Sequence, residues 1–182
     1  MDQHYDAIII GTGQAGPPLA KRLSAAGMSV AVIERHLFGG TCVNTGCIPT
    51  KAMVASAYAA HLARRAREFG VAIDGAVNVD MARVNARKAA ISERSRTSVE
   101  RTLRGLPRCA IYTGHARFRS AREVAVGDHV IGADRIFINV GGRAAIPRLP
   151  GLDGVPFLTN SSMMHLESAP PHLIIEIGRA HV

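Results

Sequence analysis

Apolar and polar positions at the start of the chain predict two short strands around one helix. Residues 5–10 and 29–33 are short apolar runs, which are typical of buried strands. Between them, residues 15–26 carry apolar side chains at helical spacing, and a glycine follows. Pro17 and Pro18 fall in the first turn of this helix, where a missing N–H costs little. The order strand, helix, strand is typical of an α/β domain with a parallel sheet.

Two long helices are predicted next. Residues 52–69 are rich in alanine, and Gly70 ends that stretch. Residues 81–103 form a second amphipathic stretch. Its inward positions are apolar, namely Val84, Ile91, Val99 and Leu103.

The rest of the chain changes to short strands separated by turns. These predicted strands are residues 109–113, 116–118, 123–126, 129–131 and 135–140. Residues 143–156 hold three Pro and two Gly, which indicates an extended linker. Residues 173–175 are expected to begin a further apolar strand. The pattern therefore predicts a central parallel sheet followed by a small β-meander.

Composition narrows the class of protein. Apolar residues make up 47% of the chain, so a buried core can form. The net charge is +8, but the arginines are scattered among Glu, Ser and Ala along amphipathic stretches, which favours a solvated surface over a nucleic-acid partner. No stretch approaches the roughly 20 apolar residues of a membrane span, and no signal peptide is visible. We therefore expect a cytoplasmic protein without a nucleic-acid or membrane partner.

The first candidate site is a glycine-rich turn. Gly11, Gly13 and Gly16 fit the pattern G-x-G-x-x-G, and the turn lies between a predicted strand and a predicted helix. Such glycines allow a tight turn, close approach of backbone to a pyrophosphate, and close packing of helix on strand. Glu34 ends the second strand, where an acid can accept hydrogen bonds from ribose hydroxyls. These features indicate a dinucleotide site without separating FAD from NAD.

The second candidate site is a cysteine pair. In a regular helix the Cα atoms of Cys42 and Cys47 would be ~8–9 Å apart, too far for a disulfide. Asn44 and Gly46 lie between them and permit a distorted backbone. Two buried structural cysteines are one alternative; zinc is another, but no second Cys or His pair gives suitable spacing, so we assign no metal ligand. A redox dithiol fits best, with one thiol of lowered pKa near a helix N-terminus.

The stretch around the cysteines resembles the signature of the flavin-linked pyridine nucleotide–disulphide oxidoreductases. Residues 39–51 read G-G-T-C-V-N-T-G-C-I-P-T-K, and the resemblance extends over residues 5–175. Mercuric reductase and dihydrolipoamide dehydrogenase are similar members. The resemblance implies a Rossmann-like FAD-binding domain with three ββα layers, and a redox-active disulfide between Cys42 and Cys47. In the family the first cysteine exchanges with substrate and the second lies next to the flavin.

The same resemblance implies roles for individual residues. The three glycines of the turn would hold the FAD pyrophosphate, and Glu34 the adenosine ribose. Gly40 and Thr41 would lie along the cofactor, and Lys51 by the flavin ring. Two later residues complete the implied FAD contacts, namely Ala116 at the adenine and Gly141 in a segment that reads Val-Gly-Gly where the family has Ala-Thr-Gly.

The family reaction passes a hydride from NAD(P)H to FAD, then two electrons to the cysteine pair and on to a substrate. We expect residues 1–150 to form the FAD-binding domain, and residues 151–175 to be a linker and first strand toward an NAD(P)-binding domain. Residues 176–182 resemble a translated sequencing adapter, so we expect a non-native tail. A homodimer is expected for the parent protein, and we expect the short chain alone to bind FAD poorly and turn over nothing.

The sequence leaves several alternatives open. The substrate is Hg(II), a dihydrolipoamide-type compound, a glutathione-like disulfide or another small molecule, and the electron donor is NADH or NADPH. A nucleotide-binding module whose cysteines are structural is one rival function. A thiol redox switch that works without flavin is another.

Overall fold

A computed structural model describes residues 3–176 of the chain. The described strands form a six-stranded sheet in the order β3-β2-β1-β6-β5-β4. The strands are β1 (Gln3–Ile10), β2 (Val30–Glu34), β3 (Cys109–Thr113), β4 (Arg117–Ser120), β5 (Glu123–Val126) and β6 (His129–Ile138). β1 pairs in parallel with both β2 and β6, and β2 pairs in parallel with β3. The meander β4–β6 is antiparallel.

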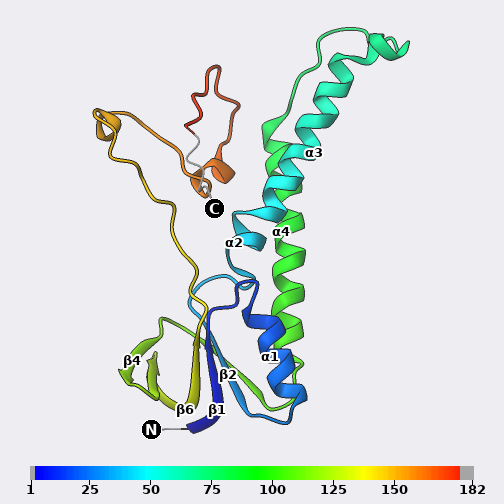
Figure 1. Cartoon of the computed structure of the whole chain (residues 1–182). Coiled ribbons are helices and arrows are strands. Elements are labelled where there is room, and N and C mark those ends of the chain that lie inside the picture. Colours follow the sequence, from blue (N-terminus) through cyan, green and yellow to red (C-terminus); the bar gives the residue numbers. More distant parts are fainter. Residues whose placement is uncertain (1–2, 177–182) are drawn as a thin grey trace, which may run out of the picture.

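The helices lie to one side of the sheet (Figure 1). They are α1 (Gly16–Ala25), α2 (Gly40–Asn44), α3 (Cys47–Arg64) and α4 (Met81–Arg104), with short 3-10 turns η1 (Ala66–Phe69), η2 (Leu152–Gly154) and η3 (Ser162–His165). Of these, α1 and α4 pack on one face of the parallel strands. Ile9 and Val32 of the sheet meet Ala20 of α1 and Leu103 of α4, and all four are buried. Burial of such apolar side chains is the main force that holds helix to sheet.

The opposite face of the parallel strands is covered by the meander. Val124 and Val126 of β5 are buried against Ile8 and Ile33 in one apolar cluster. The alternation of inward and outward side chains along β1 and β2 therefore supplies two cores, one toward the helices and one toward β5. The α/β class and the central parallel sheet are confirmed, and the two cores produce the expected three layers.

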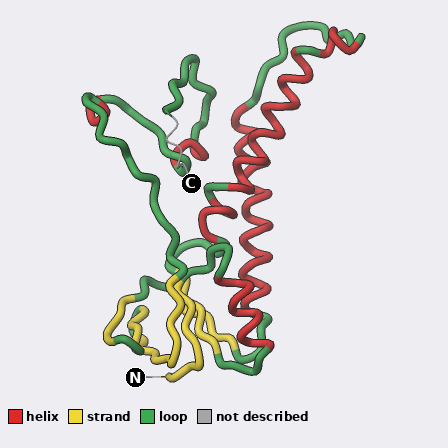
Figure 2. The backbone as a smooth tube through the Cα atoms, viewed as in Figure 1, coloured by secondary structure: helices red, strands yellow, loops and turns green. Residues whose placement is uncertain are grey.

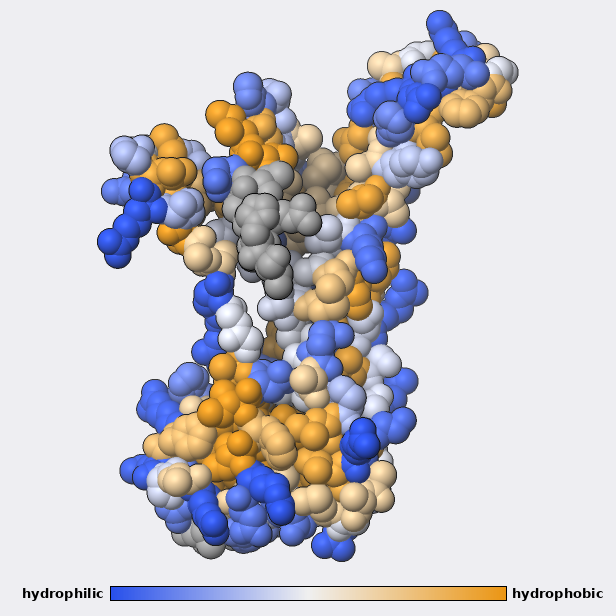
Figure 3. Space-filling model, in the orientation of Figure 1, coloured by the Kyte–Doolittle hydropathy of each residue, from blue (hydrophilic) through white to orange (hydrophobic). Residues whose placement is uncertain are grey.

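The α3–α4 hairpin extends well beyond the sheet (Figure 2). Its α3 carries an exposed apolar row, with Val54, Tyr58 and Leu62 exposed by 59%, 60% and 38%. These positions are four residues apart and so lie on one side of the helix. Figure 3 shows apolar and charged residues side by side along this hairpin.

Residues 139–176 leave the end of β6 as a long segment with little regular structure (Figure 2). This segment returns to the helical hairpin at η3. There the ammonium of Lys88, buried on α4, donates to the Met164 carbonyl and to Asn85 Oδ1. The Asn85 amide in turn donates to the Leu166 carbonyl at 2.7 Å. Met164 is itself buried, so the segment is anchored at this point.

Several sequence-based boundaries differ from the structure. The strands expected at 129–131 and 135–140 are one strand, because β6 pairs with β5 at its start and with β1 along the rest. α3 begins at Cys47 rather than at residue 52, because Pro49 lies in the first turn, where proline is tolerated. The strand expected at residues 173–175 is not formed. Those side chains are exposed by 42–85%, and none of the strands described within residues 3–176 pairs with them.

Residues 177–182 lie outside the described part, so the expectation of a non-native tail is not addressed there. Within residues 3–176, no helix has the length and apolar character needed to cross a bilayer. Nor do three His, Cys, Asp or Glu side chains gather as metal ligands anywhere in that described range.

Candidate functional site

The glycine turn connects the carboxyl end of β1 to α1. Gly11 has φ +103°, and a Cβ there would lie 2.2 Å from the Asn139 carbonyl oxygen. A Cβ on Gly16 would lie 2.4 Å from the Gly11 carbonyl oxygen. Neither position can hold a side chain without moving backbone, so the turn requires glycine at both.

The turn also presents free donors. Within the described residues, the amides of Gly13, Gln14 and Ala15 have no protein acceptor. The start of α1 adds little beyond them, because the Gly16 amide donates to the Gly13 carbonyl and the next two residues are prolines. An anion at this turn would therefore be bound by the three amides of the turn together with the positive end of the helix dipole.

Glu34 stands at the carboxyl end of β2 and is 8% exposed. Its Oε2 accepts hydrogen bonds from the Thr12 amide at 3.0 Å and the Thr12 hydroxyl at 2.5 Å. Its Oε1 accepts from the His36 amide at 3.0 Å. The carboxylate predicted to bind ribose is thus held in one orientation next to the glycine turn.

The cysteine motif forms two helices rather than a loop. Cys42 lies in the short helix α2 and Cys47 is the first residue of α3. The chain breaks between them at Gly46, which has φ −125° and ψ −117°. A Cβ there would lie 2.9 Å from the Thr41 carbonyl oxygen. The predicted distortion is therefore present, and it is what brings the two cysteines together.

The two thiols are adjacent but not bonded. Cys42 is half-buried, Cys47 is exposed, and both are free thiols. The hydrogen bond between the Cys42 thiol and the Cys47 side chain, aided by burial, raises the pKa of Cys42, while the Lys51 ammonium acts in the opposite direction. The neighbouring thiol stabilises the protonated form more than the nearby charge stabilises the thiolate.

The two candidate sites touch each other. Gly40 has φ +61°, and a Cβ there would lie 2.7 Å from the Gly13 Cα. The Gly39 amide donates to the Thr12 hydroxyl at 3.1 Å. The start of the cysteine motif therefore packs directly on the glycine turn.

The other predicted contact residues lie at three places. Thr41, in α2, and Lys51, the fifth residue of α3, are both exposed near the cysteines. Ala116 is half-buried against the apolar cluster of the meander. Gly141 follows β6 and has φ +67°, and a Cβ there would have no atom within 4 Å. The backbone link from the Gly114 amide to the Glu34 carbonyl, 2.9 Å long, brings the start of the meander beside β2.

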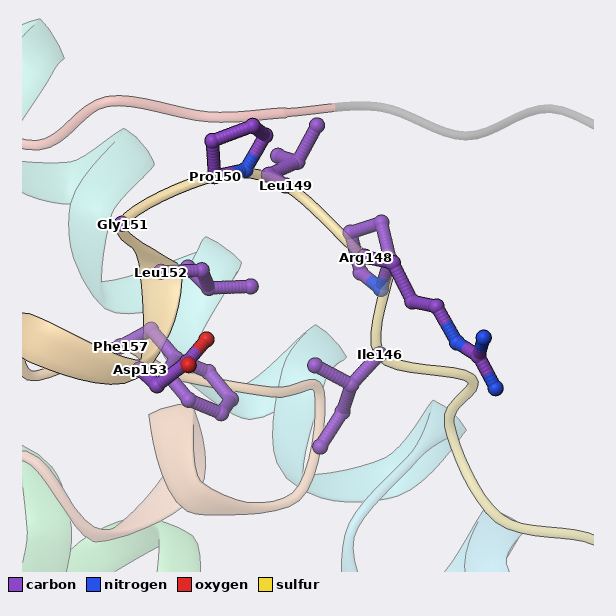
Figure 4. Close-up of a pocket in the computed structure, with 9 residues that line it drawn as sticks. Ile146, Arg148, Leu149, Pro150, Gly151, Leu152, Asp153 and Phe157 are labelled. Atoms are coloured by element: carbon purple, nitrogen blue, oxygen red, sulfur yellow. The ribbon is translucent and has the colours of Figure 1, made fainter.

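The meander bears a hollow of about 650 Å³. It is lined by residues on both sides of Ala116, namely Gly114, His115, Arg117, Phe118, Arg119, Ala125 and Gly127. A further hollow of about 590 Å³ lies in the extended segment at residues 146–153 and Phe157 (Figure 4). Figure 4 shows apolar side chains around it, with Arg148 pointing away. Neither hollow is lined by Cys42 or Cys47, so neither is the redox site.

Sequence reasoning missed three polar residues that shape the site. Thr12 was only the variable position of the glycine pattern. Asn44 was valued for its backbone, but its side-chain amide donates to the carbonyls of Phe38 and Gly40, each at 2.9 Å. Asn139 donates to the Gly11 carbonyl at 3.2 Å. Only the position of Asn139 directly after a strand could have suggested its role.

The arrangement fits a dinucleotide such as FAD. The turn is closed to side chains at Gly11 and Gly16, offers free amides, and has a fixed carboxylate at the end of the adjacent strand. These are the parts that bind a pyrophosphate and a ribose in dinucleotide sites. Cys42, the first cysteine of the dithiol, follows the contact residue Gly40 by two positions.

The sequence profile described as "Pyridine nucleotide-disulphide oxidoreductase" matches residues 5–175. A mercuric reductase from Acidithiobacillus ferrooxidans is 32% identical, over 95% of this chain and 33% of its own length. A dihydrolipoyl dehydrogenase from Acholeplasma laidlawii is 29% identical, over 98% of this chain and 54% of its own. The chain thus spans only part of the length of these curated relatives.

Solved structures of a flavoprotein disulfide reductase are also similar to this chain. The HOCl-induced flavoprotein disulfide reductase RclA from Escherichia coli has a TM-score of 0.71 and 31% identity, over 90% of this chain and 34% of its own. Its Cu(II) complex has a TM-score of 0.72 and 31% identity, over 92% of this chain and 35% of its own.

Proposed function

Since the chain belongs to the pyridine nucleotide-disulphide oxidoreductase family, we propose that it is the FAD-binding and dithiol-bearing part of such an enzyme. The single observation that carries the proposal is the contact between Gly40 and Gly13, which packs the cysteine motif on the nucleotide turn. A nucleotide bound at that turn would extend along the motif that bears Cys42 and Cys47.

We infer that FAD is held by residues already arranged for it. The amides of Gly13, Gln14 and Ala15 would bind its pyrophosphate, and Glu34 would accept from its adenosine ribose. Ala116 and the adjoining hollow of the meander are assigned to the adenine end. Thr41, Lys51 and Gly141 are assigned to the remainder of the cofactor.

When bound, FAD supplies the two-electron chemistry that links NAD(P)H to a disulfide. The protein's own part is the dithiol. In the oxidised state a Cys42–Cys47 disulfide would accept two electrons and two protons and become the dithiol. The dithiol then returns two electrons and two protons to the substrate by thiol–disulfide exchange, in which a thiolate attacks the substrate disulfide. The exposed ammonium of Lys51 favours the thiolate of Cys42 during that step.

The proposed class of substrate is based on the proteins to which this chain is similar. Mercuric reductases and a dihydrolipoyl dehydrogenase are similar in sequence, and RclA is similar in structure as a flavoprotein disulfide reductase also solved with Cu(II). We propose a disulfide or a thiophilic metal ion as the substrate. The dithiol suits both, because a thiolate attacks disulfides and binds soft metals.

We propose that the whole protein contains further parts and acts as a homodimer. Residues 1–150 would be the FAD-binding domain, and residues 151–175 would lead to an NAD(P)-binding domain. The exposed apolar row of Val54, Tyr58 and Leu62 supports a subunit contact along α3. By itself the chain would bind FAD weakly and catalyse no turnover.

Thiol counting on the purified chain tests the redox pair. The sample is oxidised, unfolded and titrated with a thiol reagent before and after reduction with dithionite. A reversible Cys42–Cys47 disulfide predicts one thiol before reduction, from Cys109, and three after it. The Cys109→Ser variant is the matched control and should give none and two. No change on reduction would favour the rival in which the cysteines are structural.

Flavin binding is tested separately by titrating the chain with FAD and following the quenching of flavin fluorescence. Binding that is lost in Gly13→Trp, which places a bulky side chain in the glycine turn, is the expected result. A reducible cysteine pair in a chain that binds no FAD would favour the thiol switch instead.

A further inference from the structure

Thr12 joins three separate segments through one buried side chain. It is 0% exposed and lies between Gly11 and Gly13. Its hydroxyl donates to Glu34 Oε2 and accepts from the Gly39 amide, while its own amide also donates to Glu34 Oε2. The end of β2, the glycine turn and the start of the cysteine motif therefore meet at one oxygen atom.

These bonds determine what Glu34 can still bind. A carboxylate has about four acceptor positions, two on each oxygen. Thr12 occupies both positions on Oε2, and the His36 amide occupies one on Oε1. One acceptor position on Oε1 remains for a ligand, and it can be used only if Thr12 keeps the carboxylate from rotating.

We propose that Thr12 is the positioning residue for ribose recognition, which deepens and rests on the FAD site proposed above. It touches no ligand itself. Its hydroxyl directs Glu34 Oε1 toward a ribose hydroxyl and holds the cysteine motif, at Gly39, against the same turn. The role requires the hydroxyl group, since valine has the same shape but can neither donate nor accept.

The test measures recognition of ribose apart from general binding. ADP and 2′,3′-dideoxy-ADP are titrated into the full chain by calorimetry, because they differ only in the ribose hydroxyls. The wild type should prefer ADP by about tenfold, the effect of one charge-assisted hydrogen bond. Thr12→Val should lose that preference while keeping its affinity for the dideoxy compound. Thr12→Ser should keep the preference.

Two further measurements separate positioning from simple stabilisation. The double variant Thr12→Val with Glu34→Gln should bind ADP no more weakly than Glu34→Gln alone, because both changes remove one interaction. Without any ligand, the Gly39 amide should exchange with solvent faster in Thr12→Val than in Thr12→Ser. If Thr12→Val does not fold, Thr12→Ala takes its place and should likewise lose the preference for ADP, and an undiminished preference in that variant would overturn the role of Thr12.

Different failures have different meanings. An undiminished preference for ADP in Thr12→Val, or an equal loss of affinity for both compounds, would overturn the role of Thr12 and leave the FAD site intact. A wild-type chain that binds neither ADP nor FAD would overturn the FAD site and this inference together.

Discussion

Gly40 lies against Gly13, so closely that a Cβ on Gly40 would be 2.7 Å from the Gly13 Cα. Because Gly40 precedes the first cysteine of the motif by two residues, this contact sets the distance between the glycine turn and the dithiol. The contact is between backbones, so no side-chain rearrangement can relieve a clash there. It joins the two sites that the sequence predicts separately.

The first prediction concerns that contact. Gly40→Ala should lower the free energy of unfolding by about 2–4 kcal/mol, from positive-φ strain and the clash together. Urea unfolding followed by circular dichroism measures it. Gly27→Ala is the matched control, since Gly27 has φ +80° with nothing within 4 Å of its Cβ position. Gly27→Ala should lower the free energy of unfolding by only about 1–2 kcal/mol, from the positive-φ strain alone. Equal losses would mean that the Gly40 contact is not tight.

The second prediction concerns the thiols. The Cys47 side chain raises the pKa of Cys42 and the Lys51 ammonium lowers it. Cys47→Ala should therefore lower the pKa of Cys42, and Lys51→Met should raise it. The rate at which iodoacetamide alkylates Cys42 is followed by peptide mass spectrometry. Its pH dependence gives the pKa of Cys42 in each variant. Lys21→Met, on α1, is the control and should leave the profile unchanged. Shifts of the same sign in the two variants would contradict the assignment.

The third prediction concerns pH and β1. Hydrogen bonds from the Ser29 amide and hydroxyl to Asp6 Oδ2, 2.6 and 2.7 Å long, lower the pKa of Asp6 below its ordinary value of 3.8. The Asp6 carboxylate therefore binds a proton less readily in the folded state than in the unfolded state. The ionised Asp6 carboxylate therefore stabilises the folded state above pH 3.8. This stabilisation is lost as the pH falls through the lower pKa that Asp6 has in the folded state.

Melting temperatures of wild type and Asp6→Asn, compared from neutral to acid pH, test this dependence. The difference between the two should be present at pH 7 and shrink below about pH 4. Asp74→Asn, in an exposed loop, should show no such change. A difference that stays constant with pH would contradict the role of the Asp6 charge.

The fourth prediction concerns the anchor of the extended segment. Lys88→Met removes the donor to the Met164 carbonyl, so amide exchange at Met163, Met164 and Leu166 should become faster. Lys88→Met should lower the free energy of unfolding by only about 1 kcal/mol. The lost hydrogen bond destabilises the fold, but removing a charge from a buried position offsets part of that loss. Hydrogen exchange with mass spectrometry measures the segment. Arg104→Met, at the exposed end of α4, is the control. Unchanged exchange in Lys88→Met would show that Met164 is held by packing alone.

Patterns that depend on neighbouring residues could be predicted from the chain itself. The strands at 5–10 and 29–33, the helix after the glycine turn and the long helix at 81–103 follow from local periodicity. The requirement for glycine at 16 is also local, because a Cβ there would meet the carbonyl oxygen of Gly11 in the same turn, whereas at Gly11 the nearest atom is the carbonyl oxygen of the distant Asn139. The break between Cys42 and Cys47 was predicted from the distance limit of a disulfide, with Asn44 and Gly46 as residue types that permit it.

Contacts between distant segments could not be predicted in this way. The sequence contains Thr12 and Glu34, but their bond exists only because parallel pairing brings the ends of β1 and β2 together. The failed strand at 173–175 shows the converse, since an apolar run without a partner strand leaves its backbone unpaired. Local sequence thus determined which segments become strands, helices and tight turns, and it supplied the residue types of both sites. The tertiary structure alone decided which polar groups meet, because hydrogen bonds act over about 3 Å between residues that the chain places far apart.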